Sequence, residues 1–173
     1  MYYNDVLELM EKNNEWTDFL KYLLVKTEQK IEKNILLRLA AQCWHMLTFY
    51  DFYDSSLINR EYLINILEYS YDLFRLKFSE DSSCLWLFGY FITINPLDFY
   101  FIDDDVFKVE DLGETLIRKA LCFEPENVFA QILVSNMDNS SPSHNFIDEN
   151  CVFDTFSTNS EVDKYFIEIF TNQ

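Results

Sequence analysis

The residue types that could do chemistry in this chain are few and lie far apart. His45 follows Trp44 in a helical stretch, and His144 lies in a polar segment. A metal site needs several His or Cys ligands at short spacing, such as i and i+4 on one helix. The four cysteines form no CxxC pair and stand alone on separate segments: Cys43, Cys84, Cys122 and Cys151. We therefore expect no catalytic residue, no metal and no cofactor, and predict that the protein is not an enzyme.

The one concentrated group of titratable side chains is acidic. Residues 103–105 are three consecutive aspartates, and carboxylate oxygens are the ligands that hard cations take. The calcium-loop pattern of alternate acids with a central Gly is absent, so a solvated turn and a protein-binding surface are the other interpretations. Aromatic anchors within a charged rim are typical of protein interfaces, and aromatic side chains flank these acids. The candidate partner-binding residues are Asp98, Tyr100, Phe101, Asp103, Asp104, Asp105, Glu110 and Asp111.

The net charge of −17 arises from 30 acidic and 13 basic residues, which are unevenly distributed. Residues 1–95 hold 14 acids and 9 bases, whereas residues 96–173 hold 16 acids and 4 bases. Such a field repels nucleic acid and anionic lipid and speeds encounter with cationic partners. We expect a basic protein partner and no nucleic acid, membrane or small-molecule ligand.

The elements that must position these residues are helical. A chain of 173 residues is typical of one domain that buries about 70% of its unfolded surface. With 2 Gly and 3 Pro, it lacks the turn residues that sandwiches and barrels use. We predict a mainly α fold, over 1–173 as a single helical domain, with about seven or eight helices in a bundle or a repeat-like array.

Apolar residues recur at helical spacing along most of the chain. Predicted N-caps are Asn4, Asn14, Asn59, Ser82 or Ser83, and Ser160. Almost every residue from Cys84 to Ile92 is apolar, which predicts a helix buried on nearly all sides. Close approach of a neighbouring helix would explain Gly89 inside it. Pro96 ends this helix, and helical spacing resumes at Glu110.

Two segments are less regular. Residues 98–108 are compatible with one short strand or an ordered loop. Residues 137–159 are rich in Asn, Ser and Asp, so we predict an ordered polar loop with apolar anchors. The N-terminus lacks a basic region, and the apolar run from Cys84 to Ile94 is shorter than the about 20 residues that a bilayer needs. We therefore expect a cytoplasmic protein.

Residues 119–133 are similar to the end of a tetratricopeptide repeat, in which Ala-Leu, Pro and Asn close one helix pair and begin the next. Ala120, Leu121, Pro125 and Asn127 carry this resemblance. A 34-residue period does not persist, so the resemblance implies repeat-like helix pairs as an architecture. A helical-repeat adaptor or secretion chaperone that holds a client peptide is the alternative function.

In size, acidity and aromatic content, the chain resembles the immunity proteins of bacterial contact-dependent growth inhibition systems. That resemblance implies a cognate toxin domain, usually a nuclease, whose active or substrate-binding site the protein occludes. Carboxylates would then stand in for substrate phosphates against the Lys and Arg residues of the toxin. An acidic toxin inhibitor is the function that the sequence favours.

Overall fold

The computed structural model describes residues 3–53, 58–139 and 160–171. Within these ranges the chain forms eight α-helices and two 3₁₀ helices and no strand, which confirms the mainly α prediction. The helices are α1 (Tyr3–Lys12), α2 (Trp16–Gln29), α3 (Lys33–Thr48), η1 (Tyr50–Phe52), α4 (Arg60–Lys77), α5 (Ser82–Ile94), η2 (Pro96–Phe99), α6 (Val106–Phe123), α7 (Val128–Met137) and α9 (Glu161–Thr171). None of them is long and apolar enough to cross a membrane.

The chain divides into two compact units, with the boundary inside α4, between Ser70 and Tyr71. Unit 1 consists of residues 1–70 together with the C-terminal segment that carries α9. Unit 2 consists of residues 71–147. The single domain over 1–173 stays a prediction.

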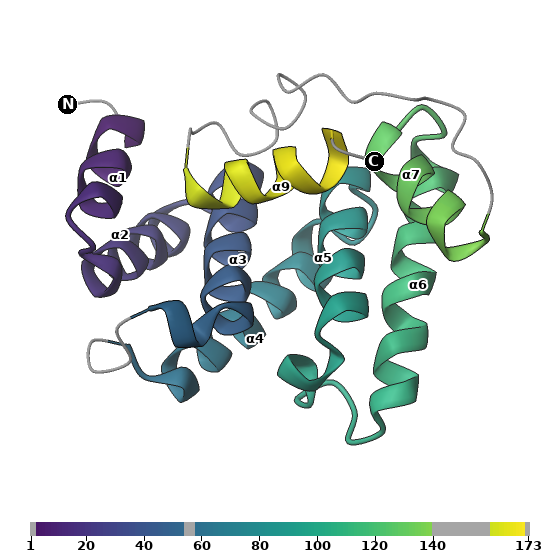
Figure 1. The fold of residues 1–173 in the computed structure, drawn as a ribbon, viewed down its shortest axis with the longest axis horizontal. Coiled ribbons are helices and arrows are strands. Elements are labelled where there is room, and N and C mark those ends of the chain that lie inside the picture. Colours follow the sequence, from purple (N-terminus) through teal and green to yellow (C-terminus); the bar gives the residue numbers. More distant parts are fainter. Residues whose placement is uncertain (1–2, 54–57, 140–159, 172–173) are drawn as a thin grey trace. The chain divides into compact units, whose positions relative to one another are not determined.

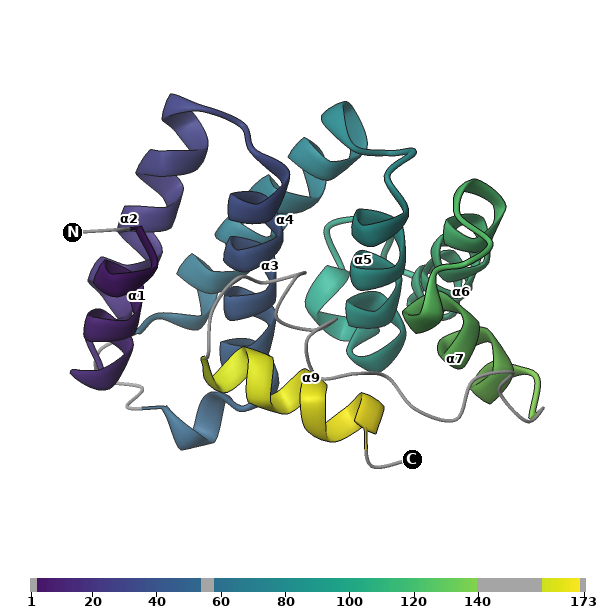
Figure 2. The same cartoon turned by 90° about the horizontal axis from the view of Figure 1, so that it is seen from above.

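In unit 1, α3 is the central helix. Every residue from Leu36 to Trp44 is buried, including the polar side chains of Arg38 and Gln42. The apolar face of α2 packs against α3, and α9 packs on it although the two helices are far apart in the sequence (Figure 2). The core of unit 1 thus joins the N-terminal helices to the C-terminal one.

In unit 2, α5 holds the central place that its apolar sequence predicts. All residues from Cys84 to Ile92 are buried. The Phe88 ring stacks on Phe74 with centroids 4.6 Å apart, and the Trp86 ring stacks on Phe129 at 4.7 Å. The most extensive helix–helix contact of the unit joins α5 to α6, which runs beside it (Figure 1).

The predicted caps are partly right. The Asn59 side chain accepts a hydrogen bond from the backbone N–H of Glu61, and Ser160 accepts one from Asp163 N–H, as predicted. Asn14 does not cap α2, because it takes a left-handed conformation (φ 57°) and Glu15 is the residue that precedes the helix. Helix α5 is capped by Asp81, which accepts from the backbone N–H of Cys84, so the serine prediction is wrong.

The ambiguous segment after Pro96 is an ordered loop. The 3₁₀ helix η2 leads into turns, and α6 begins at Val106, four residues before the predicted Glu110. Asp105 causes the early start, because its carboxylate accepts a hydrogen bond from Phe107 N–H and so caps the helix. The predicted polar loop at 137–159 begins with the last residue of α7, and its part from 140 to 159 lies outside the described residues.

Candidate functional site

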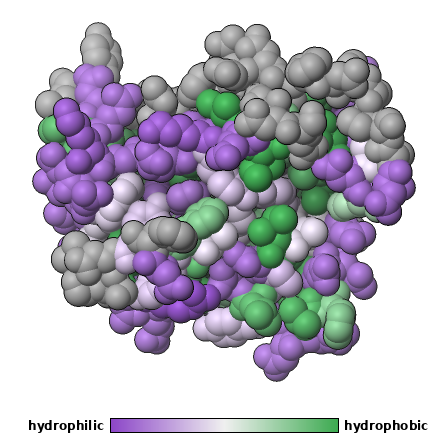
Figure 3. Space-filling view, in the orientation of Figure 1, coloured by the Kyte–Doolittle hydropathy of each residue, from purple (hydrophilic) through white to green (hydrophobic). Residues whose placement is uncertain are grey.

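An exposed apolar group lies at the end of unit 2 where α5 ends and α6 begins. Leu97 is 75% exposed, Tyr100 is 58% exposed and Phe107 is 74% exposed. Figure 3 shows hydrophobic side chains gathered at the lower right, over this part of the fold. Large apolar side chains that face water together, within a polar rim, mark interaction surfaces. We call this group and the acids around it the acidic–aromatic surface.

The acids of this surface come from the loop and from the first turns of α6. Asp104, Glu110 and Asp111 are exposed. Glu110 and Asp111 follow Phe107 at i+3 and i+4, so all three side chains share one face of α6. An apolar anchor thus stands directly beside two carboxylates, which is an arrangement that favours a cationic partner.

Asp103 and Asp105 also stabilise the local backbone through hydrogen bonds. An Asp103 carboxylate oxygen accepts a hydrogen bond of 2.8 Å from Asp105 N–H, and this bond, with Lys108 nearby, lowers the pKa of Asp103. Asp105 caps α6 through Phe107 N–H at 3.1 Å. Lys108 Nζ lies 3.6 Å from Asp103 and 3.9 Å from Asp105. These two acids therefore hold the loop in shape and are partly neutralised by Lys108.

Two predicted site residues do not lie on the open surface as expected. Asp98 is only 4% exposed, because η2 packs against α5 and α6 through Asp98 and Phe99. Phe101 is half-buried, and its ring packs edge-on against Tyr71 at 6.0 Å and lies 5.6 Å from Phe99. The prediction that Asp98 faces a partner is therefore wrong for this surface. Phe101 packs beneath the exposed side chains, against Tyr71 and Phe99.

Leu97 and Phe107 belong to the surface, although neither stands among the predicted contact residues. Phe107 is one of the aromatic side chains that flank the three aspartates in the sequence, and a prediction that α6 begins at Val106 would have placed it on one helix face with Glu110 and Asp111. Leu97 gives no such signal, because it follows Pro96 in a segment whose orientation depends on how η2 packs.

The His, Cys, Asp and Glu side chains of the described residues do not gather into a metal site. No cluster of three or more His, Cys, Asp or Glu side chains there has the geometry to hold a metal ion. Cys43 and Cys84 are buried thiols, and burial raises the pKa of Cys43. Cys122 is an exposed free thiol, and Cys151 lies outside the described residues.

No protein-family model, curated protein or solved structure matches this chain.

Proposed function

We propose that the protein is an acidic inhibitor that binds a basic toxin domain, such as a nuclease, and occludes its active or substrate-binding site. The observation that supports this proposal is the acidic–aromatic surface, where Tyr100, Phe107 and Leu97 are exposed among carboxylates. The exposed rings and the leucine would fill apolar hollows on the partner. The carboxylates would meet its lysines and arginines in place of substrate phosphates.

The two kinds of side chain have different effects on binding. Exposed carboxylates accelerate encounter with a basic partner, and the chain's net charge of −17 adds a long-range attraction that salt screens. Apolar anchors that become desolvated in the complex slow its dissociation. An inhibitor of this design therefore associates fast at low salt and dissociates slowly.

The surface can be tested with charge-reversal variants that leave its backbone intact. Asp103 and Asp105 are unsuitable for this purpose, since they hold the loop and cap α6. We choose Asp104→Lys, Glu110→Lys and Asp111→Lys combined, which reverses three exposed carboxylates. A matched control reverses three exposed carboxylates of unit 1, with the substitutions Glu28→Lys, Glu61→Lys and Glu68→Lys, and has the same net charge.

Each protein is immobilised and used to capture partners from a lysate of its native host. The proposal expects a basic protein that binds the wild type and the control and is lost from the surface variant. Addition of the wild-type protein must then abolish the RNA- or DNA-cleaving activity of the captured protein. Equal capture by the surface variant, or a captured protein whose activity the wild type leaves unchanged, contradicts the proposal. Capture of the partner through a short linear segment alone would favour the adaptor or chaperone instead.

A further inference from the structure

Unit 1 holds an open cavity of about 370 Å³ with mostly aromatic walls. Its lining residues come from α2, from α3 and the residue that caps its end, from the segment that follows η1 and from the start of α9, namely Trp16, His45, Phe49, Tyr53 and Glu161. Glu161 is exposed and Phe49 and Tyr53 are half-buried, so the cavity reaches the protein surface. Its volume lies within the roughly 300–1,000 Å³ that is typical of ligand-binding pockets.

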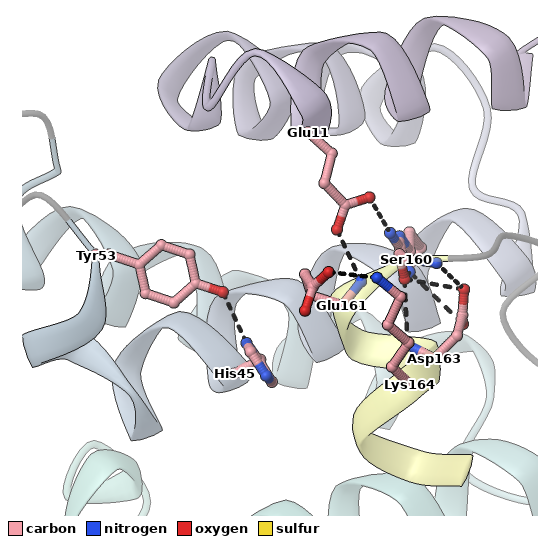
Figure 4. Close-up of polar contacts among 8 residues, drawn as sticks. Glu11, His45, Tyr53, Ser160, Glu161, Asp163 and Lys164 are labelled. Carbon is pink, nitrogen blue, oxygen red and sulfur yellow. Dashed lines mark hydrogen bonds and ion pairs between the residues drawn. The ribbon is translucent and has the colours of Figure 1, made fainter. Parts of the chain in front are cut away.

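The aromatic rings of the cavity wall are inclined to one another. The rings of Trp16 and Tyr53 are 5.3 Å apart at 86°, and the rings of His45 and Phe49 are 4.7 Å apart at 46°. The Tyr53 hydroxyl lies 2.8 Å from His45 Nδ1, and this contact fixes the orientation of the tyrosine ring (Figure 4). Aromatic faces inclined to one another can border a cationic group, because each face carries the negative end of the ring quadrupole.

The charges around the cavity favour a cation. Burial is the main cause that lowers the pKa of His45 to about 4, so its imidazole is neutral at pH 7 and donates no positive charge. Burial also raises the pKa of Tyr53, and the negative charges of Glu11 and Glu161 raise it further. These two carboxylates line an adjoining cavity of about 320 Å³ as well, together with Glu8 and Lys12.

Arg38 is the one buried cationic side chain near the cavity among the described residues. It forms ion pairs and a hydrogen bond with other groups of unit 1. Its guanidinium lies 3.6 Å from Glu11 and 3.7 Å from Asp163, and it donates a hydrogen bond to Ser160. Glu161 itself contacts Lys164, whose Nζ lies 2.6 Å from Oε1 of the carboxylate. Both partners of that contact are more than half exposed, and such surface pairs are weak and easily exchanged.

We propose that this cavity binds an arginine side chain of a protein partner, with the guanidinium between the aromatic walls and bonded to the Glu161 carboxylate. Arginine fits the site better than lysine because its guanidinium is planar, stacks on aromatic faces and donates in a fork to a carboxylate. The site belongs to unit 1, whereas the acidic–aromatic surface belongs to unit 2. An experiment can therefore contradict the arginine site without contradicting the acidic–aromatic surface, and the reverse.

The contact between Lys164 and Glu161 gives the proposal a distinctive signature. An incoming guanidinium competes with Lys164 for the same carboxylate, so removal of the lysine charge should strengthen binding. A purely apolar guest would be indifferent to this change. Lys164→Met should therefore tighten binding of arginine, and Glu161→Gln should weaken it.

The test titrates the full chain with acetyl-Gly-Arg-Gly-amide and follows the indole N–H resonance of Trp16 by NMR. The dissociation constant should be about millimolar, because a single stacked ion pair is a weak contact. The same peptide with citrulline in place of arginine keeps the shape and removes the charge. It should bind about tenfold more weakly. Free agmatine carries the same guanidinium without a peptide backbone and serves as the small-molecule comparison.

Three variants complete the test. Glu161→Gln should weaken arginine-peptide binding about tenfold and Lys164→Met should tighten it about threefold, whereas Glu168→Gln, an exposed control on the same helix, should leave it unchanged. The proposal is overturned if citrulline binds as well as arginine, if Glu161→Gln has no effect, or if the Trp16 resonance does not move. Tight binding of agmatine with no binding of the peptide assigns the cavity to a free cation and also overturns it.

Discussion

Gly89 and Gly113 face each other where α5 crosses α6. A Cβ added at Gly89 would lie 2.8 Å from the backbone oxygen of Gly113, and one added at Gly113 would lie 3.0 Å from the oxygen of Gly89. They are the 2 glycines of the whole chain. A helix-interior glycine costs about 1 kcal/mol relative to alanine. Both are therefore explained by the close approach of the two backbones at the centre of unit 2.

Gly89→Ala should destabilise unit 2 by about 1–3 kcal/mol despite the better helix propensity of alanine. The new methyl group would lie 2.7 Å from Ile117 Cγ1 as well as against the Gly113 carbonyl, and a backbone atom cannot move aside cheaply. Urea unfolding of wild type and variant measures the difference. A variant that is as stable as wild type, or more stable, would mean that the helices are not packed this closely.

The turn between α6 and α7 depends on Asn127, which is buried although the residues before it in the turn are exposed. Its side-chain oxygen accepts from Ala130 N–H at 3.0 Å, and its side-chain nitrogen donates to Ser82 Oγ at 3.0 Å. Asn127→Ala should cost about 1–3 kcal/mol, because it removes a helix cap and a buried hydrogen bond together. Asn127→Asp keeps the cap acceptor and should lose less. Equal losses for the two variants in urea unfolding would contradict the role assigned to the cap, and an Asn127→Asp variant as stable as wild type would contradict the role assigned to Ser82.

A buried ion pair between Arg38 of α3 and Asp163 of α9 holds the two helices together. Asp163 is fully buried, lies 3.7 Å from Arg38 and forms a reciprocal capping pair with Ser160. Asp163→Asn should cost about 3–5 kcal/mol, because one partner of a buried ion pair loses its charge. Amide hydrogen exchange should then show faster exchange in α9. The exposed control Lys164→Met should change the stability by less than about 1 kcal/mol, and comparable losses in both would show that the buried pair is not special.

Acid should destabilise the protein through His45. Burial lowers the pKa of His45 to about 4 from its ordinary 6.5. Below pH 6.5, the imidazole therefore becomes protonated in the unfolded chain but stays neutral in the folded chain, which favours unfolding. Between pH 7 and pH 5 this should remove about 2 kcal/mol of stability. Burial raises the pKa of Glu11, whose contribution therefore has the opposite sign. Wild type should lose more stability than His45→Gln over this range, and identical losses would contradict the burial of a neutral imidazole.

The parts of the fold that follow from the sequence are those set by local chemistry. The buried helix from Cys84 to Ile92 and the caps Asn59 and Ser160 could be predicted, because periodicity and cap residues act over a few neighbours. The cap of α5 could not, since Asp81, Ser82 and Ser83 are equally good acceptors. The Ser82 hydroxyl instead donates a long-range hydrogen bond to the Ala120 carbonyl oxygen, which no local pattern predicts.

The candidate sites depended more on tertiary packing. The exposed acids Asp104, Glu110 and Asp111 were predicted, whereas the burial of Asp98 is decided by how η2 packs on α5 and α6. The aromatic cavity could not be predicted at all, because its walls come from four segments between Trp16 and Glu161. Composition alone favoured one acidic half of the chain, yet the structure adds a second candidate site in unit 1.

The central claim is that the acidic–aromatic surface recognises a basic protein. The most direct measurement is the association rate constant of the captured basic partner with wild-type protein and with the Asp104→Lys, Glu110→Lys, Asp111→Lys variant, across a series of salt concentrations. Wild type should associate at least about tenfold faster at low salt, and the difference should shrink as salt screens the charges. The Glu28→Lys, Glu61→Lys, Glu68→Lys control should stay close to wild type. Equal association rates for wild type and the surface variant at low salt would contradict the claim.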